Sequence, residues 1–403
     1  MTSSWTKQLG TSSNDGGNGV TTDSSDNIYV TGLTGGGLDG NTSSGNHDIV
    51  LVKYDSSGTK QWTKQLGTSS TDIGYGVTTG SSGNIYVTGL TEGGLDGNTS
   101  SGSYDMFLVK YNSSGTKQWT NQLGTSSNDV GYVVTTDSSG NIYVTGYTEG
   151  GLDGNTSSGS YDMFLVKYNS SGTKQWTKQL GTSSYETGQS VITDSSDNIY
   201  VTGNTSGDLD GNTNSGGQDI FLVKYNSSGT KQWTKQLGTS STDIGYGVTT
   251  GSSGNIYVTG WTRGGLDGNT NSGESDIFLI KYNSSGIKQW TNQLGNSSRD
   301  EGNSVSTDSS DNIYVTGITE GELDGNINFG GRDIFLIKYD SSGTKQWTKQ
   351  LGTSSHDGGN GVTTDSSDNI FVTGHTGGGL EGNTTSGEDD IVLVKYNSSG
   401  IRQ

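Results

Sequence analysis

The chain has 403 residues, a formal net charge of −19, and neither cysteine, proline nor alanine. The missing cysteines exclude disulfides and thiolate metal sites, and the negative charge argues against nucleic acid or an anionic membrane surface as partner. No run of about 18 apolar residues is present, so we expect no membrane insertion. The N-terminus lacks the pattern of a signal peptide. Localisation stays open, with a secreted or cell-surface location favoured.

Tryptophan recurs every 57 residues through the chain, at Trp5, Trp62, Trp119, Trp176, Trp233, Trp290 and Trp347. We therefore expect a single domain over 1–403 made of the repeats 5–61, 62–118, 119–175, 176–232, 233–289, 290–346 and 347–403. Some segments are identical between copies, such as 62–89 and 233–260. This identity indicates recent amplification or deliberate design, and the sequence leaves both open.

Each repeat predicts four strands, here named A to D in chain order and given for the second repeat: 75–79, 84–90, 105–111 and 116–124. Short polar segments ending in Gly or Asp join A to B and C to D, as in tight turns. Strand C is apolar on both faces, which predicts that it is sandwiched between neighbours. We expect the small Gly89 to let adjacent sheets approach closely.

Seven such units predict an all-β, seven-bladed β-propeller with four antiparallel strands per blade. An open solenoid would need atypical capping repeats at its ends, and none is visible. The segment at 5–10 has the sequence of a D strand without the rest of its blade. We expect it to pair with strand C of the last repeat, at 391–396, and so to close the ring.

The segments DSSGNIYVTG (137–146) and DMFLVKYNSSGTKQW (162–176) resemble the bacterial seven-bladed β-propeller repeat family (SBBP repeats). The first segment is also similar to NHL-type propeller repeats. The resemblance covers all seven units. It implies the propeller fold and a binding or surface module, and it transfers no catalytic residue.

No catalytic arrangement stands out in the sequence, so we expect no enzymatic activity and no cofactor. His47, His356 and His375 fall at three different repeat offsets, which suggests isolated surface substitutions rather than a metal site or a general base. The recurrent loop LDGN, with Asp96 and Asn98 in the second repeat, leaves a Ca²⁺ site open as an alternative to a simple turn.

Three residue types never change between repeats and predict structural roles. The first is the Asp that opens strand C, such as Asp48, and the second is the Lys near its end, such as Lys53. For both we expect a strand-end cap or a buried ion pair. The third is the recurrent Trp, for which we expect packing between blades, with a sugar platform at the rim as the alternative.

Nearly all variation falls on the face that carries the D–A and B–C loops. The positions there hold residues typical of binding sites. The predicted ligand-binding residues are those before strand A (Asn18, Tyr75, Tyr132, Gln189, Tyr246, Asn303 and Asn360), at the end of strand B (Tyr147, Asn204, Trp261 and His375) and before strand C (Tyr104, Tyr161 and Arg332). We expect a monomeric, non-catalytic binding module for a protein or a glycan. The alternative is a purely structural scaffold whose loops have drifted.

Overall fold

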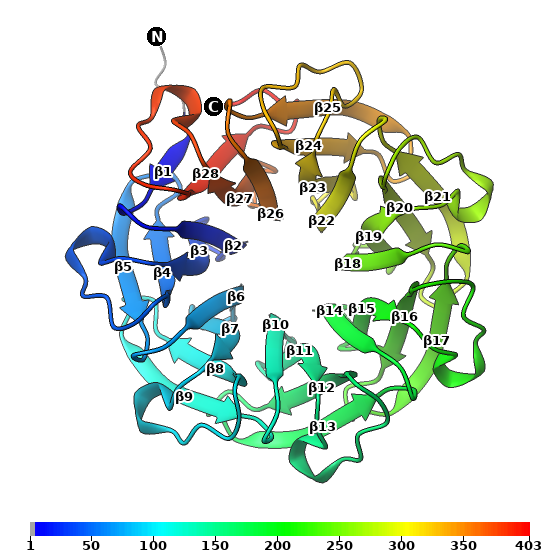
Figure 1. Ribbon diagram of the computed structural model, residues 1–403, viewed down its shortest axis with the longest axis horizontal. Helices are drawn as coiled ribbons and strands as arrows, with labels where there is room; N and C mark the ends of the chain where they lie inside the picture. The colour runs from blue at the N-terminus through cyan, green and yellow to red at the C-terminus, as the bar shows by residue number, and fades with distance from the viewer. Residues whose placement is uncertain (1–4) are drawn as a thin grey trace.

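A computed structural model describes residues 5–403 and shows seven four-stranded antiparallel sheets arranged around a central opening (Figure 1). The sheets stand radially, like the blades of a propeller, with strand A innermost and strand D outermost. The predicted seven-bladed β-propeller is therefore confirmed. Blades 1 to 7 are numbered by their A strands in chain order.

The A strands are β2 (Asp15–Thr22), β6 (Asp72–Thr79), β10 (Asp129–Thr136), β14 (Glu186–Thr193), β18 (Asp243–Thr250), β22 (Asp300–Thr307) and β26 (Asp357–Thr364). The B strands are β3 (Ile28–Thr34), β7 (Ile85–Thr91), β11 (Ile142–Thr148), β15 (Ile199–Thr205), β19 (Ile256–Thr262), β23 (Ile313–Thr319) and β27 (Ile370–Thr376). The C strands are β4 (Asp48–Tyr54), β8 (Asp105–Tyr111), β12 (Asp162–Tyr168), β16 (Asp219–Tyr225), β20 (Asp276–Tyr282), β24 (Asp333–Tyr339) and β28 (Asp390–Tyr396).

The D strands are β5 (Lys60–Leu66), β9 (Lys117–Leu123), β13 (Lys174–Leu180), β17 (Lys231–Leu237), β21 (Lys288–Leu294), β25 (Lys345–Leu351) and β1 (Lys7–Leu9). One-turn 3-10 helices lie in six B–C loops: η1 (Leu38–Gly40), η2 (Leu95–Gly97), η3 (Leu152–Gly154), η4 (Leu209–Gly211), η5 (Leu266–Gly268) and η6 (Leu380–Gly382). Across residues 5–403, no helix is long and apolar enough to span a membrane.

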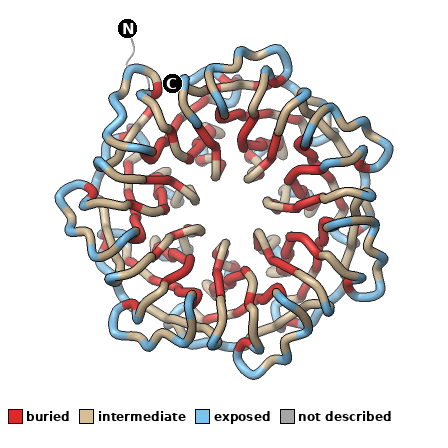
Figure 2. The backbone as a smooth tube through the Cα atoms, in the orientation of Figure 1, coloured by how far each residue is buried: buried red, intermediate tan, exposed pale blue. Residues whose placement is uncertain are grey.

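The hydrophobic core lies between blades rather than within them. One cluster joins Tyr29 and Leu51 of blade 1 to Val87 and Phe107 of blade 2. Strand C contributes to the clusters on both of its sides, and its apolar side chains are fully buried, as the sequence predicts. Figure 2 shows the buried backbone concentrated in the blades and the exposed backbone in the outer loops. A single blade would therefore leave two apolar faces in water.

Every A strand carries a β-bulge at the same repeat position. In blade 2, Gly74 pairs with Gly89 and Gly76 pairs with Thr88, so that Tyr75 between them has no partner in the ladder. The extra residue bends the strand and redirects its own side chain. The seven bulge residues are Asn18, Tyr75, Tyr132, Gln189, Tyr246, Asn303 and Asn360.

The predicted role of Gly89 in the approach of adjacent sheets is wrong. A Cβ atom at Gly89 would lie 1.8 Å from the Ile73 carbonyl oxygen, which belongs to the same blade at its bulge. The glycine that permits close contact between blades is Gly74. A Cβ atom there would lie 2.6 Å from Thr31 Oγ1 and 3.1 Å from the Gly32 carbonyl oxygen, both in the preceding blade.

The ring closes through the N-terminal strand, as predicted. Strand β1 pairs with β28 and completes blade 7, with Gln8 opposite Val392. Gln8 Nε2 donates to Asp390 at 2.7 Å, and Gln8 Oε1 accepts from the Leu380 amide at 3.0 Å. Gln65 makes the equivalent contacts inside blade 1, so β1 acts as an ordinary D strand. The described ends of the chain meet here, since the Trp5 backbone amide donates to the Gln403 carbonyl oxygen at 2.5 Å.

Deleting residues 1–10 should leave blade 7 with an open edge and lower the melting temperature by about 5 °C or more, because three ladder positions and the packing of Trp5 and Leu9 are lost. Differential scanning calorimetry measures this change. Lys7→Asn is the matched control, since Asn121 and Asn292 occupy this position in other repeats. Equal melting temperatures for the deletion and the full chain would contradict closure by β1.

Candidate binding face

The D–A and B–C loops meet at one end of the blades, and we call this end the long-loop face. In blade 1 the B–C loop covers 35–47, and the D–A loop into blade 2 covers 67–71. A parallel bridge joins His47 to Thr71, which ties the end of one B–C loop to the next blade. The same bridge recurs between Tyr161 and Tyr185 and between Arg332 and His356. The loops are therefore fixed to one another around the ring.

The seven bulge residues converge on one cavity of about 380 Å³ at the centre of the ring. Each reaches it from a different blade, because the bulge turns the side chain out of the sheet. The cavity is lined by Asn18, Tyr75, Tyr132, Gln189, Tyr246, Asn303 and Asn360, together with neighbouring Gly, Val and Ser residues of the A strands. The structure thus brings together the whole predicted first ring of ligand-binding residues.

The ring of bulge residues is divided into two unlike arcs. Blades 6, 7 and 1 carry Asn303, Asn360 and Asn18, and each side-chain amide donates to a glycine carbonyl of the next blade at 2.9 Å. These amides are used in holding the blades together. Blades 2, 3 and 5 carry tyrosines instead, which extend the aromatic surface at the cavity.

A continuous row of tyrosines runs outward from this cavity across blades 2, 3 and 4. The ring centroids are 5.5 Å apart for Tyr75 and Tyr132, 5.9 Å for Tyr132 and Tyr147, 4.8 Å for Tyr147 and Tyr161, and 4.5 Å for Tyr161 and Tyr185. All five side chains are half-buried. Burial raises the pKa of Tyr132 and of Tyr147, so both hydroxyls remain protonated at neutral pH.

Two glutamates lie beside tyrosines of this part of the face: Glu149 beside Tyr161 of the row, and Glu92 beside Tyr104. Glu149 accepts from the side-chain amide of Asn128 at 2.9 Å, and Glu92 accepts from the backbone amide of Thr71 at 3.2 Å. Burial, followed by the charge of Glu149, raises the pKa of Tyr161. We call the residues Tyr75, Tyr104, Tyr132, Tyr147, Tyr161, Tyr185, Glu92 and Glu149 the tyrosine–glutamate sector.

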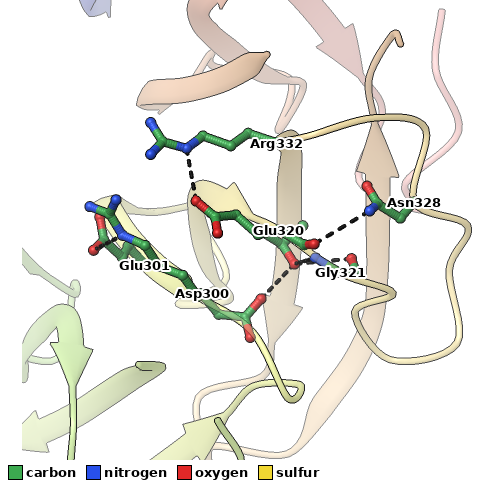
Figure 3. Close-up of polar contacts among 8 residues, drawn as sticks. Asp300, Glu301, Glu320, Gly321, Asn328 and Arg332 are labelled. Atoms are coloured by element: carbon green, nitrogen blue, oxygen red, sulfur yellow. Dashed lines mark hydrogen bonds and ion pairs between the residues drawn. The ribbon is translucent and has the colours of Figure 1, made fainter. Parts of the chain in front are cut away.

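The cationic side chains of the long-loop face lie on another part of the ring. Every lysine lies on a C or D strand, whereas Arg263, Arg299 and Arg332 lie in the loops of blades 5 and 6. Arg332 Nε contacts Glu320 Oε1 at 2.9 Å (Figure 3). Arg299 Nε contacts Glu301 Oε1 at 2.5 Å. Arg299 and Arg332 are therefore already paired with carboxylates.

His356 is exposed, whereas His47 and His375 are half-buried. Burial lowers the pKa of His375, while the charges of Asp389 and Asp357 oppose that shift and His356 reinforces it. His375 lies on strand β27 of blade 7 and His356 in the loop that enters this blade, and the interpretation of the three histidines as single substitutions stays a prediction. His47 lies in a different blade.

Trp261 and Asn204 are buried, contrary to the expectation that the end of strand B is open to a ligand. Trp261 is 9% exposed, and the Arg263 guanidinium lies 5.4 Å from its ring centroid. Asn204 is 2% exposed and accepts from Thr187 Oγ1 at 2.6 Å. Both side chains lie opposite residues of strand A, which covers strand B from the inside.

The other predicted ligand-binding residues on the outer part of the face are half-buried: Tyr104, Tyr147, Tyr161, Arg332 and His375. Sequence reasoning missed Tyr185, Glu92 and Glu149. A signal was available for Tyr185, because its repeat position varies as strongly as the chosen ones, with Asn14, Thr71, Asn128, Thr242, Arg299 and His356 in the other copies.

The invariant Asp and Lys of strand C do not pair with each other. Asp48 is fully buried and accepts from Gln65 Nε2 at 2.7 Å and from the Ser44 amide at 2.8 Å, as a strand-end cap. Lys53 donates to the Ser113 carbonyl of the next blade at 3.3 Å and lies 5.3 Å from the Tyr29 ring centroid. The cap is confirmed, and the buried ion pair is wrong.

The LDGN loops have a structural role in this fold. Asp39 forms an ion pair with Lys60 and accepts from Thr63. Asp39 and Gly40 both have positive φ angles, 53° and 78°, and Asn41 Nδ2 donates to the Leu38 carbonyl at 2.8 Å. Among residues 5–403, no group of three or more acidic or histidine side chains is placed to hold a metal ion. The expectation that the chain holds no cofactor stays a prediction, and Ca²⁺ at this loop would have to compete with Lys60.

Buried carboxyl groups lie directly below the long-loop face, at the start of the A strands. Asp300 is fully buried and accepts from the Asn296 backbone amide at 2.7 Å and from Thr319 Oγ1 at 2.5 Å. Burial raises its pKa to about 6, with the charge of Asp276 adding to the shift. Burial likewise raises the pKa of Asp72, Asp129 and Asp243.

Comparison with known proteins places this architecture among propeller repeats. The profile of the family described as Beta-propeller repeat matches the chain at 4–39, 61–96, 118–153, 175–210, 232–267, 289–324 and 346–381. The chain is 24% identical over 92% of its length to an uncharacterized WD repeat-containing protein of Acanthamoeba polyphaga mimivirus, and 26% identical over 50% of its length to the regulatory protein FlaEY of Caulobacter vibrioides. It spans only 36% and 24% of the lengths of these two relatives.

Among solved structures, the WD40 β-propeller domain of Doa1 is similar with a TM-score of 0.53 and 9% identity, over 96% of this chain and 95% of that one. The Neurospora crassa Pan2 WD40 domain has the same TM-score and identity, over 94% and 88% of the two chains. At this identity the likeness concerns the fold alone.

Replacing Trp261 by Leu, the residue at Leu33 and Leu90, should lower the free energy of unfolding by about 1–3 kcal/mol, because a buried aromatic ring is lost. Urea denaturation measures this change. The control is Glu274→Gly, which introduces at an exposed position the residue found at Gly217 and Gly331. It should change stability by less than about 0.5 kcal/mol. Unchanged stability of the Trp261 variant would show that the indole is not part of the packed structure.

The melting temperature should fall as the pH rises from about 4 to 7. A carboxyl group whose folded pKa is raised stabilises the fold below its ordinary pKa of 3.8, and this stability is lost as the pH passes the folded value, about 6 for Asp300. Carboxyl groups whose folded pKa is lowered, such as Asp55 and Asp340, stabilise the fold above pH 3.8, and this stability is lost only as the pH falls below that value. Calorimetry between pH 4 and 7 tests the direction of the change in melting temperature. ¹³C NMR of the wild type and of Asp300→Asn shows whether Asp300 is a carboxyl group that titrates in this range. A melting temperature that rises from pH 4 to 7 would contradict this prediction.

Proposed function

We propose that this chain, which belongs to the beta-propeller repeat family, is a non-catalytic binding module that recognises a protein or a glycan on its long-loop face. One observation carries the proposal. The bulge residues differ among seven otherwise similar repeats, yet all seven side chains line a single central cavity. A ligand at that point would contact every blade.

The physical character of the face supports this role. The loops are bridged to one another and rest on fully buried strands, so a ligand would meet a preformed surface. Half-buried tyrosines supply contact area with little rotamer entropy to lose, and their hydroxyls add hydrogen bonds. The WD repeats in the name of one relative and the WD40 propellers of similar architecture are in keeping with an interaction module.

The rival hypothesis is a structural scaffold whose loops have drifted without a ligand. Drift accounts for variation at exposed positions, and copying of a whole segment accounts for recurrent residues such as Tyr104 and Tyr161. Neither requires the tyrosines of blades 2 to 4 to contact one another in a continuous row. The two hypotheses differ in whether any ligand depends on the bulge residues.

Tyr75→Asn with Tyr132→Asn tests the proposal by copying residues that the fold already uses at Asn18, Asn303 and Asn360. We expect ligands retained by the wild-type protein on glycan and peptide arrays to bind the double variant about tenfold more weakly, because two central aromatic side chains are removed. Biolayer interferometry on the retained ligands gives the dissociation constants.

The control lies on the opposite face, in the turn between strands C and D. Asn112→Asp introduces the residue found at Asp55 and Asp340 and should leave each dissociation constant within about twofold. If every retained ligand binds the double variant as well as the wild type, or if none is retained, the scaffold hypothesis holds.

A further inference from the structure

We infer that the tyrosine–glutamate sector binds arginine side chains of a basic peptide segment in a partner protein. This inference rests on the proposed function and adds to it the chemical class of the ligand and its place on the long-loop face. It is carried by the geometry of the five-tyrosine row, the two glutamates of the sector and the distribution of charge around the ring.

The shape of the row favours a small planar cation over a sugar ring. Successive rings meet at interplanar angles of 64°, 44°, 67° and 62°, so the row is folded and has no extended coplanar surface. A sugar ring stacks on an exposed aromatic face, whereas a guanidinium group can lie against one ring face while the edges of others surround it. The outer end of the row, Tyr161 and Tyr185, bridges two blades and lies beside Glu149.

The protein already uses cations over its other aromatic rings. Lys53 lies over Tyr29, Lys167 lies over Tyr143, and Arg263 lies over Trp261, at 5.3, 5.2 and 5.4 Å from the ring centroids. Within residues 5–403, no lysine or arginine of the chain lies over a ring of the tyrosine row. The row therefore has aromatic faces of the kind that elsewhere hold a cation, and it leaves them to a cation from another molecule.

The negative charge of the sector favours a positively charged ligand. The long loops of blades 2 to 4 contain Glu92 and Glu149 but no lysine, arginine or histidine. Both glutamates are held by hydrogen bonds to Thr71 and Asn128, so their carboxylates are fixed before a ligand arrives. The net charge of −19 adds long-range attraction for a basic segment. In blades 5 and 6, by contrast, Arg299 and Arg332 already pair with Glu301 and Glu320, and Arg263 already lies over the Trp261 ring.

Isothermal titration calorimetry with three probes tests the inference: an acetylated and amidated Ser-Arg-Ser-Arg-Ser peptide, the same peptide with neutral citrulline in place of arginine, and cellohexaose. We expect the arginine peptide to bind at least about tenfold more tightly than the citrulline peptide, and to weaken as salt is raised from 50 to 300 mM. Citrulline keeps the size and planarity of arginine and removes its charge.

Three variants locate the site, and each introduces a residue that another repeat carries at the same position. Glu149→Ser copies Ser206 and Tyr161→Gln copies Gln218. Each should weaken binding of the arginine peptide at least about threefold. Glu274→Gly copies Gly217 and Gly331, lies exposed on blade 5 and changes the net charge as Glu149→Ser does. It should leave the dissociation constant within about twofold. Matching melting temperatures check that all three variants are folded.

Equal binding of the arginine and citrulline peptides, or equal weakening by Glu149→Ser and Glu274→Gly, would overturn the inference. Binding of cellohexaose that is lost in Tyr161→Gln would also overturn it, while leaving the long-loop face as a binding surface. The proposed function itself fails only if no array ligand depends on the bulge residues, so the two failures are distinguishable.

Discussion

The structure depends on hydrophobic cores that adjacent blades share. Side chains such as Leu51 and Phe107 come from different blades and complete one cluster, with about 1.5–3 kcal/mol gained for each large apolar side chain removed from water. Because every blade has two apolar faces, only a closed ring satisfies all of them. The same requirement explains why β1 must complete blade 7, where Ile391 and Leu393 pack against Val30 and Val52 of blade 1.

The β-bulge connects this architecture to the binding face. Its extra residue lies outside the ladder and away from the interblade cores, so neither hydrogen bonding nor packing dictates its identity. Asparagine can use the position to bond to the next blade, as Asn18 does, and tyrosine can use it to build an aromatic wall, as Tyr132 does. Seven equivalent positions can therefore diverge without disturbing the ring.

Most of the fold could be predicted because residues that recur in every repeat determine it. The predicted features are the 57-residue period, the four strands of each blade, the burial of strand C and the pairing of β1 with β28. The errors concern which side chains from different strands meet. Gly89 lies against its own blade at the bulge, Lys53 reaches the following blade, and strand A covers Trp261 and Asn204. Such contacts depend on register and on the angle between blades, which a periodic sequence does not reveal. Tyr185 was missed although its repeat position varies strongly, and its contact with Tyr161 is known only from the structure, where a parallel bridge joins the two residues.

A ring of equivalent blades has no preferred direction, so orientation of a ligand must come from the loops. Here tyrosines and glutamates without an ion pair lie on the long-loop side of blades 2 to 4, while Arg299 and Arg332, paired with Glu301 and Glu320, lie in the loops of blade 6. The bulge residues follow the same division, with tyrosines grouped on one arc and asparagines on the other. A basic ligand would find free aromatic faces and glutamates on blades 2 to 4, whereas on blades 5 and 6 arginines of the chain itself already occupy such partners. This difference would orient the ligand across the central cavity. The asymmetry costs the fold little, because every residue that builds it stands outside the shared cores.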